Sequence, residues 1–198
     1  MKILERARQI ILNPRAAWQV INGEAIDARQ LFINYAAPLA LVPAVCSMIG
    51  MTLFGLRMPA GNVIRAPFIE ALLAGVAGYV LHLGGILVGA WLVKALAPLF
   101  NSKSDFGSVL KVVVYSMTPV WLVGIFSIVP GLGILAILGL YGIYLLALGL
   151  PAILGTPGNK VLWYVLAILV VGLVISFILS MIVVGAFYGP MFMRMMSA

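Results

Sequence analysis

The side chains that could do chemistry are few in this chain, and they lie far apart in the sequence. There is one histidine, His82, one cysteine, Cys46, and five acidic residues among 198. No two acidic residues share an apolar segment in the way a general acid and a general base would. No histidine, cysteine and acidic residues have zinc-site spacing, and no serine lies in a nucleophile-elbow pattern. We therefore expect no enzyme, no bound metal and no cofactor.

His82 stands out because it is an ionisable residue near the middle of a long apolar segment. Such residues are rare inside membranes and are candidates for a functional role. Two interpretations stay open: a neutral histidine hydrogen-bonded to a neighbouring backbone carbonyl or hydroxyl, and a transport or sensing residue. In either case desolvation disfavours the charged imidazolium, so we expect His82 to be neutral at pH 7.

Four glycines flank this histidine at regular spacing. Gly75, Gly78, His82, Gly85 and Gly89 follow one another at intervals of three, four, three and four residues. This is the period of a helix-packing seam, and glycine in a seam lets another backbone approach closely. The pattern predicts that His82 points into a helix contact and that the protein forms a homo-oligomer.

A proline interrupts a later apolar segment. Pro119 leaves the Tyr115 carbonyl without its helical hydrogen-bond donor, and interrupted helices often line binding sites in transporters. A simple kink is the alternative. The candidate intramembrane polar site comprises His82, Tyr115, Thr118, Pro119, Tyr141 and Tyr144.

The composition places these residues in a membrane. The chain is 64% hydrophobic and 9% charged, whereas a soluble domain carries about 25% charged residues. Its formal net charge is +7, with the charges gathered between apolar segments. We therefore expect anionic lipid headgroups as partners, and no nucleic acid. The sequence names no protein partner.

Five apolar segments are long enough to cross a bilayer, which takes about 20 residues each. The third and fourth are joined by an uncharged turn at Pro130 and could form a partial hairpin, but their length favours full crossing. We predict an all-α integral membrane protein with a five-span domain over residues 30–198. The predicted spans are 31–54, 68–97, 109–129, 133–152 and 161–187.

Residues 1–29 are predicted to form a cytoplasmic amphipathic segment that precedes the spans. Ile3, Leu4, Ala7, Ile10 and Ile11 share one helical face. A basic helix of this kind is suited to lie in the headgroup plane, and the alternative is a helix packed under the bundle. The predicted membrane-surface residues are Lys2, Arg6, Arg8, Arg15 and Trp18.

Three short motifs resemble a known family. They are Asn13-Pro14-Arg15-x-x-Trp18, then Tyr115-x-x-Thr118-Pro119, then Tyr141-x-x-Tyr144-Leu145-x-x-x-Gly149-x-Pro151. Together with five apolar segments, they resemble the bacterial branch of the Yip family, membrane proteins named for interaction with Ypt/Rab GTPases. The resemblance implies five spans and a cytoplasmic N-terminus. The vesicle-traffic role of eukaryotic members is not carried over, because their Asp-Leu-Tyr-Gly-Pro motif is missing.

Two functional hypotheses follow. The first is a non-enzymatic, self-associating scaffold that organises or shapes the membrane. The alternative is a small transporter or channel for an ion, metabolite or lipid, with a path near His82 and the Pro119 break. A cavity that reaches His82 would favour the alternative, and a closed helix contact would favour the scaffold.

The basic residues predict the orientation in a bacterial inner membrane. With the N-terminus inside, nine Lys and Arg residues fall on the cytoplasmic side and three on the outer side, as the positive-inside rule requires. Reporter fusions at Lys103 and at Ala198 should therefore report the cytoplasm and the outside, respectively. Cytoplasmic signals from both fusions would contradict this orientation.

Overall fold

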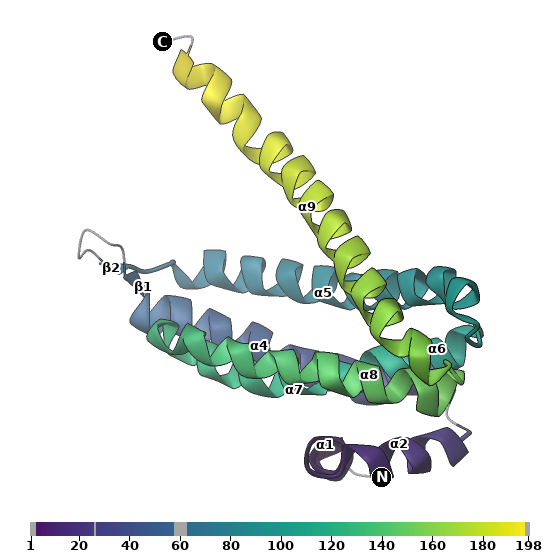
Figure 1. Ribbon diagram of the computed structural model, residues 1–198. Coiled ribbons are helices and arrows are strands. Elements are labelled where there is room, and N and C mark those ends of the chain that lie inside the picture. Colours follow the sequence, from purple (N-terminus) through teal and green to yellow (C-terminus); the bar gives the residue numbers. More distant parts are fainter. Residues whose placement is uncertain (1–2, 26, 58–62, 197–198) are drawn as a thin grey trace.

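The computed structural model describes residues 3–25, 27–57 and 63–196, with the side chains of 56, 57, 64, 130 and 179–196 left aside. The described part is helical except for one antiparallel pair of two-residue strands (Figure 1). Five helical segments are long and apolar enough to cross a membrane, which confirms the predicted number of spans. They are Ala28–Phe54, Phe68–Phe100, Phe106–Ile128, Gly131–Leu154 and Gly158–Ile178.

The regular elements follow the chain in this order. They are α1 (Ile3–Leu12), α2 (Pro14–Gly23), α3 (Ala28–Leu31), η1 (Phe32–Ala36), α4 (Ala37–Ile49), η2 (Gly50–Phe54), β1 (Leu56–Arg57), β2 (Val63–Ile64), α5 (Phe68–Leu96), η3 (Ala97–Phe100), α6 (Phe106–Ser116), α7 (Thr118–Val123), η4 (Gly124–Ile128), η5 (Pro130–Leu140), α8 (Tyr141–Leu154) and α9 (Gly158–Met196). Of the η elements, η1 and η2 are π-helical and the other three are 3₁₀-helical.

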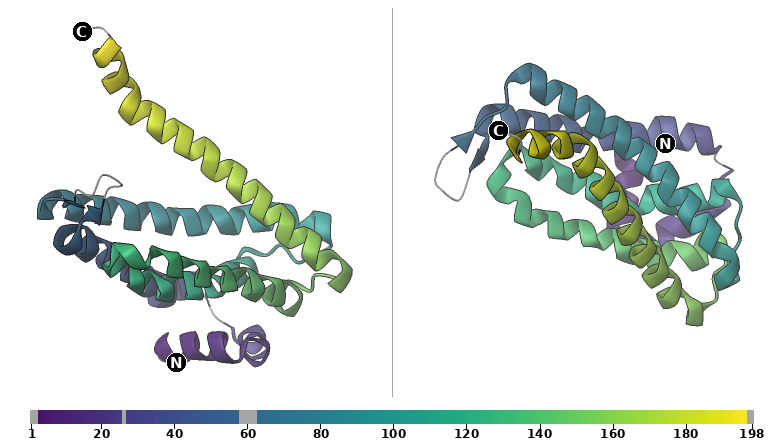
Figure 2. Two further views of the ribbon diagram at one scale, coloured as in Figure 1. Left: turned by 60° about the vertical axis from the view of Figure 1, so that its left-hand side comes forward. Right: turned by 90° about the horizontal axis from the view of Figure 1, so that it is seen from above.

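The spans form a layered bundle. α4, α7 and α8 lie side by side, α5 lies on one face of this layer, and α1 and α2 lie on the opposite face (Figures 1 and 2). We call the end of the bundle with Lys94, Lys103 and Lys160 the basic end, and the opposite end, with β1 and β2, the hairpin end. The Nζ of Lys160 donates to Asn101 Oδ1, and the backbone N–H of Lys103 donates to Leu154, which ties the loops of the basic end together.

The third and fourth spans run antiparallel over their full length, from α6 against α8 to η4 against η5. The segments nearest the hairpin end are 3₁₀-helical, which lengthens them relative to an α-helix of the same residue number. The last helix extends beyond the predicted span 161–187 at both ends. α9 runs on to Met196 and diverges from the bundle (Figure 1), whereas the sequence predicted an end near Phe187.

α6 begins with a side-chain cap. The Asp105 carboxylate accepts a hydrogen bond from the Ser108 backbone N–H at 2.9 Å. Burial raises the pKa of Asp105, but the hydrogen bonds from Ser108 and the charges of Lys111 and Lys103 together lower it below its ordinary value. The capped turn starts the third span just after the polar loop.

The close helix contacts lie at glycines outside the predicted seam. A Cβ placed on Gly142 would lie 2.6 Å from the Ser116 carbonyl oxygen, and one on Gly124 would lie 2.5 Å from Pro43 Cβ. At Gly78, Gly85 and Gly89, in contrast, no atom of the described residues lies within 4 Å of such a Cβ. Gly75, by contrast, lies against α4, where an added Cβ would be 3.8 Å from Met48 Cβ. The face from Gly75 to Gly89 as a helix-packing seam stays a prediction.

The N-terminal helices pack on the bundle. Ile10, Trp18 and Ile21 are fully buried, and Trp18 lies against Gly149 of α8. Arg6 and Trp18, which we expected at the membrane surface, are 4% and 1% exposed, so that prediction is wrong for both. Trp18 is buried because Gly149 of α8 leaves room for the indole, and Arg6 is buried where it pairs with Glu24. Arg8 and Arg15 are exposed, and Lys2 lies outside the described residues.

Candidate functional site

Two irregular stretches of helix meet inside the bundle. η1 in the first span is π-helical, a form frequent at functional sites, and it carries Tyr35. The third span breaks at Met117, between α6 and α7, where Pro119 removes a backbone donor. The Tyr35 and Thr118 hydroxyls lie 3.0 Å apart in a buried hydrogen bond, which joins the two irregular stretches.

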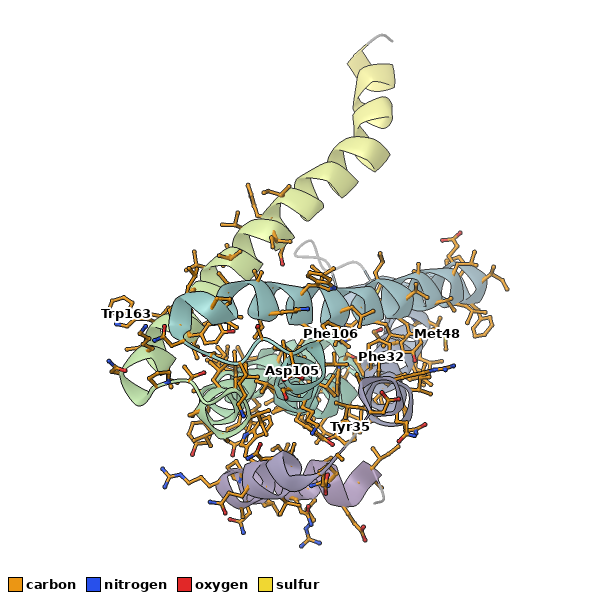
Figure 3. The ribbon with its side chains drawn as sticks, turned by 90° about the vertical axis from the view of Figure 1, so that its right-hand side faces the viewer. Phe32, Tyr35, Met48, Asp105, Phe106 and Trp163 are labelled. Carbon is orange, nitrogen blue, oxygen red and sulfur yellow. The ribbon has the colours of Figure 1, made fainter. Side chains whose placement is uncertain are left out.

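The Thr118 and Pro119 break was expected, but Tyr35 was missed. A π-turn leaves no clear residue pattern, because it differs from an α-helix in one backbone hydrogen bond. The available signal was Asn34-Tyr35, two adjacent polar residues near the start of an otherwise apolar span. Tyr35 lies beside Phe32 in Figure 3, facing the helices of the N-terminal segment.

His82 is bonded to a tryptophan of the third span. The indole Nε1–H of Trp121 donates to His82 Nε2 at 2.8 Å. An indole nitrogen is a donor only, so this His82 nitrogen is unprotonated, and a neutral ring carries its proton on Nδ1. Trp121 is fully buried, whereas His82 is partly exposed. One interpretation of the sequence had a backbone carbonyl or a hydroxyl as the partner of His82, whereas the partner in the structure is the Trp121 indole, which was missed.

A groove of about 670 Å³ lies between α4 and α5 and reaches this pair. It extends along α5 from Glu70 to His82, and 12 residues of helix correspond to about 18 Å. Its walls are mainly small and apolar: Ala40, Pro43, Ala44, Met48, Ala71, Ala74, Gly75 and Gly78. Met48, labelled in Figure 3, marks the α4 wall below α5.

A second cavity, a cleft of about 320 Å³, lies between the N-terminal helices and the first span. Its lining is more polar and includes Arg6, Glu24, Asn34, Tyr35 and Tyr115. Arg6 forms an ion pair with Glu24 and lies over the Tyr115 ring, with 5.9 Å between Cζ and the ring centroid. This cleft is on the face of the bundle away from the groove.

A layer of aromatic rings separates the two cavities. Tyr35 lines the cleft and Trp121 lines the groove, and their ring centroids are 6.4 Å apart in an edge contact. Tyr115 packs on Tyr35 at 4.8 Å and on Trp18 at 6.1 Å. The groove and the cleft therefore approach each other from two sides and are closed off by Tyr35, Thr118 and Trp121.

The remaining predicted site residues lie elsewhere. The Tyr141 hydroxyl donates to the Ile11 carbonyl at 3.0 Å and so ties α8 to α1. Tyr144 is 45% exposed, and its ring lies 5.4 Å from that of Tyr141. Of the six predicted residues, His82 lies at the groove, and Tyr115, Thr118 and Pro119 lie at or next to the Tyr35 layer. Tyr141 and Tyr144 lie together near α1. In the described residues, no group of three or more His, Cys, Asp or Glu is placed to hold a metal ion.

The family motifs fall into this framework. Trp18 of the first motif lies against Gly149 of the third and next to Tyr115 of the second. A model of the Yip1 domain matches residues 8–180 of this chain. The chain belongs to the Yip1-domain family. The resemblance deduced from the motifs is therefore confirmed.

Two proteins of Escherichia coli are similar to this chain. Inner membrane protein YohC of strain K12 is 25% identical over 182 residues, which cover 89% of this chain and 93% of that protein. YohC of strain O6:H1 matches to the same extent. No solved structure matches this chain. The five spans and these relatives identify a multi-pass protein of the bacterial inner membrane.

The Trp121–His82 bond predicts how His82 variants behave. His82→Gln keeps an acceptor for the indole, so we expect near wild-type thermal stability in detergent. His82→Leu leaves the buried indole N–H unpaired, which costs about 1–3 kcal/mol. Trp121→Phe removes the indole donor. We therefore expect His82→Leu to lower the stability less in a Trp121→Phe protein than in the wild type. Equal stability of the Gln and Leu variants would contradict this assignment.

Proposed function

We propose that this Yip1-domain protein is a small, non-enzymatic transporter of a lipid-like molecule, which binds in the groove between α4 and α5. The observation that carries the proposal is the groove itself, because it reaches both His82 and the fully buried Trp121. A closed contact around His82 would have supported a purely structural role for this residue.

The chemistry of the groove favours a mostly apolar ligand. Alanine, glycine and methionine side chains form most of its walls, and hydrocarbon chains are the solvent at this depth of a bilayer. The hydrogen bond of the His82 ring among the described residues is made through Nε2, so Nδ1 offers its N–H to the ligand. The preferred ligand therefore combines a hydrocarbon chain with an oxygen acceptor such as an ester, carboxyl or ketone.

The arrangement around the groove supports transport in addition to binding. A single layer formed by Tyr35, Thr118 and Trp121 closes the groove off from the cleft. The residues of this layer come from the π-turn of the first span and from the proline break of the third span. Interrupted helices line the binding sites of many transporters. In this proposal the two irregular stretches are the places where the layer opens.

We also propose that the basic end of the bundle faces the cytoplasm. In this orientation nine Lys and Arg residues lie on the cytoplasmic side and three on the outer side, as the positive-inside rule requires. The groove then opens toward the outer leaflet, and the cleft under Arg6 lies on the cytoplasmic side. Ligand would accordingly enter the groove from the outer half of the bilayer.

A pair of matched α5 variants tests the groove. Ala74 lines it, whereas Ala77, three residues further on, is exposed outside it. Ala74→Leu fills the groove and should sharply reduce the lipid-like molecules that mass spectrometry detects on the purified protein. Ala77→Leu adds the same side chain outside the groove and should leave the retained molecules unchanged. Equal retention by both variants and the wild type would contradict ligand binding in the groove.

A self-associating scaffold is the second candidate, and one observation favours it. Gly85 and Gly89 of α5 have no neighbouring atom within 4 Å of an added Cβ among the described residues. A glycine face left open in this way can accept a helix of a second copy. A monomer in bilayer nanodiscs at all protein concentrations would contradict the scaffold and leave the groove unaffected.

A further inference from the structure

Arg6 is a buried charge with incomplete hydrogen bonding. Its side chain is 5% exposed, and a guanidinium stays protonated even when buried. Burying such a charge is costly unless its N–H groups are paired. Glu24 accepts from Nη2, whereas Nη1 is buried without a partner among the described residues. The Tyr115 ring contacts one face of the guanidinium and supplies no strong acceptor.

A second basic residue lies beside the Arg6–Glu24 pair. Glu24 offsets the charge of Arg6, but Lys111 also reaches this site, where its Nζ donates to the Glu24 backbone carbonyl at 2.6 Å. Lys111 also interacts with the Asp105 carboxylate, so the charged side chains that line the cleft itself are Arg6 and Glu24. The cleft beside them is wide enough for more than one water molecule, at about 320 Å³.

The other walls of the cleft suit a phosphate group. Gln30 and Asn34 belong to the first two turns of the first span and carry amide N–H donors beside Arg6. At 1.5 Å per residue they lie about 3–9 Å from the start of that span. The span of 27 residues is about 40 Å long, which matches a bilayer with its headgroups, so its first turns are expected in the headgroup region. Arginine and amide groups are suited to bind phosphate oxygens.

We propose that this cleft binds an anionic phosphate group, with Arg6 as its main ligand and Gln30 and Asn34 as additional donors. The phosphate comes either from an anionic phospholipid at the basic end of the bundle or from free phosphate. Since the cleft lies between α1 and the first span, the bound group joins the N-terminal helices to the transmembrane domain. The site is separate from the groove and does not rest on transport.

The test uses the full chain in a neutral detergent, with three probes: short-chain phosphatidylglycerol, short-chain phosphatidylcholine and inorganic phosphate. A ligand at a hundred times its Kd should raise the melting temperature by about 5–10 °C. A rise with phosphatidylglycerol alone identifies a lipid headgroup site, and a rise with inorganic phosphate as well identifies a general phosphate site. A similar rise with phosphatidylcholine and phosphatidylglycerol, or no rise with any probe, would overturn the proposal.

Three variants locate the effect. Arg6→Gln should abolish the temperature rise, whereas Arg8→Gln removes the same charge from the exposed face of α1 and should retain it. Asn34→Leu keeps the Arg6–Glu24 ion pair and should weaken binding about tenfold, so it decides the matter if Arg6→Gln fails to fold. A rise lost equally in Arg8→Gln would show general charge attraction and overturn the proposal, as would a full rise in Arg6→Gln. If Arg6→Gln does not fold, a full temperature rise in Asn34→Leu overturns the proposal.

Discussion

Inside a bilayer a polar side chain must find its partner within the protein, because lipid chains offer none. The hydrogen bond from Trp121 to His82 meets this requirement for the third span and the second at once. It fixes α5 to α7 at one point near the middle of α5. Between that point and the hairpin end, small residues such as Ala44 and Gly75 leave space between α4 and α5. The Tyr79 hydroxyl also donates to the Ala37 carbonyl at 3.0 Å and so fixes α5 to α4. The groove is thus a consequence of two fixed contacts and a row of small side chains.

The same requirement explains the layer beside the groove. A π-turn and a proline break each disturb a regular helix, and both disturbances lie where Tyr35 and Thr118 share a hydrogen bond. The bond gives each buried hydroxyl a partner and holds the two irregular stretches together. A second set of contacts, from Trp18 to Gly149 and from Tyr141 to Ile11, holds the N-terminal helices on α8.

The number and approximate ends of the spans could be predicted because hydrophobicity is a property of many residues together. The partners of single residues could not. The glycine spacing around His82 was correct as a face of a helix, but it carries no information on which neighbour that face meets. Arg6 looked like a surface residue because its pairing with Glu24, 18 positions away, depends on how two helices fold back. Trp121 looked like an ordinary apolar residue, because the sequence does not show that its indole N–H lies beside His82 and donates to it.

Nitrogen NMR of the protein in bilayers at pH 7 tests this account most directly, because His82 is the only histidine and gives a single set of signals. The account predicts a neutral ring with its proton on Nδ1, facing the groove, and with an unprotonated Nε2 that accepts a hydrogen bond from the indole. Trp121→Phe should shift the Nε2 signal. A proton on Nε2, or protons on both nitrogens, would contradict the Trp121–His82 bond and with it the proposed inner end of the groove.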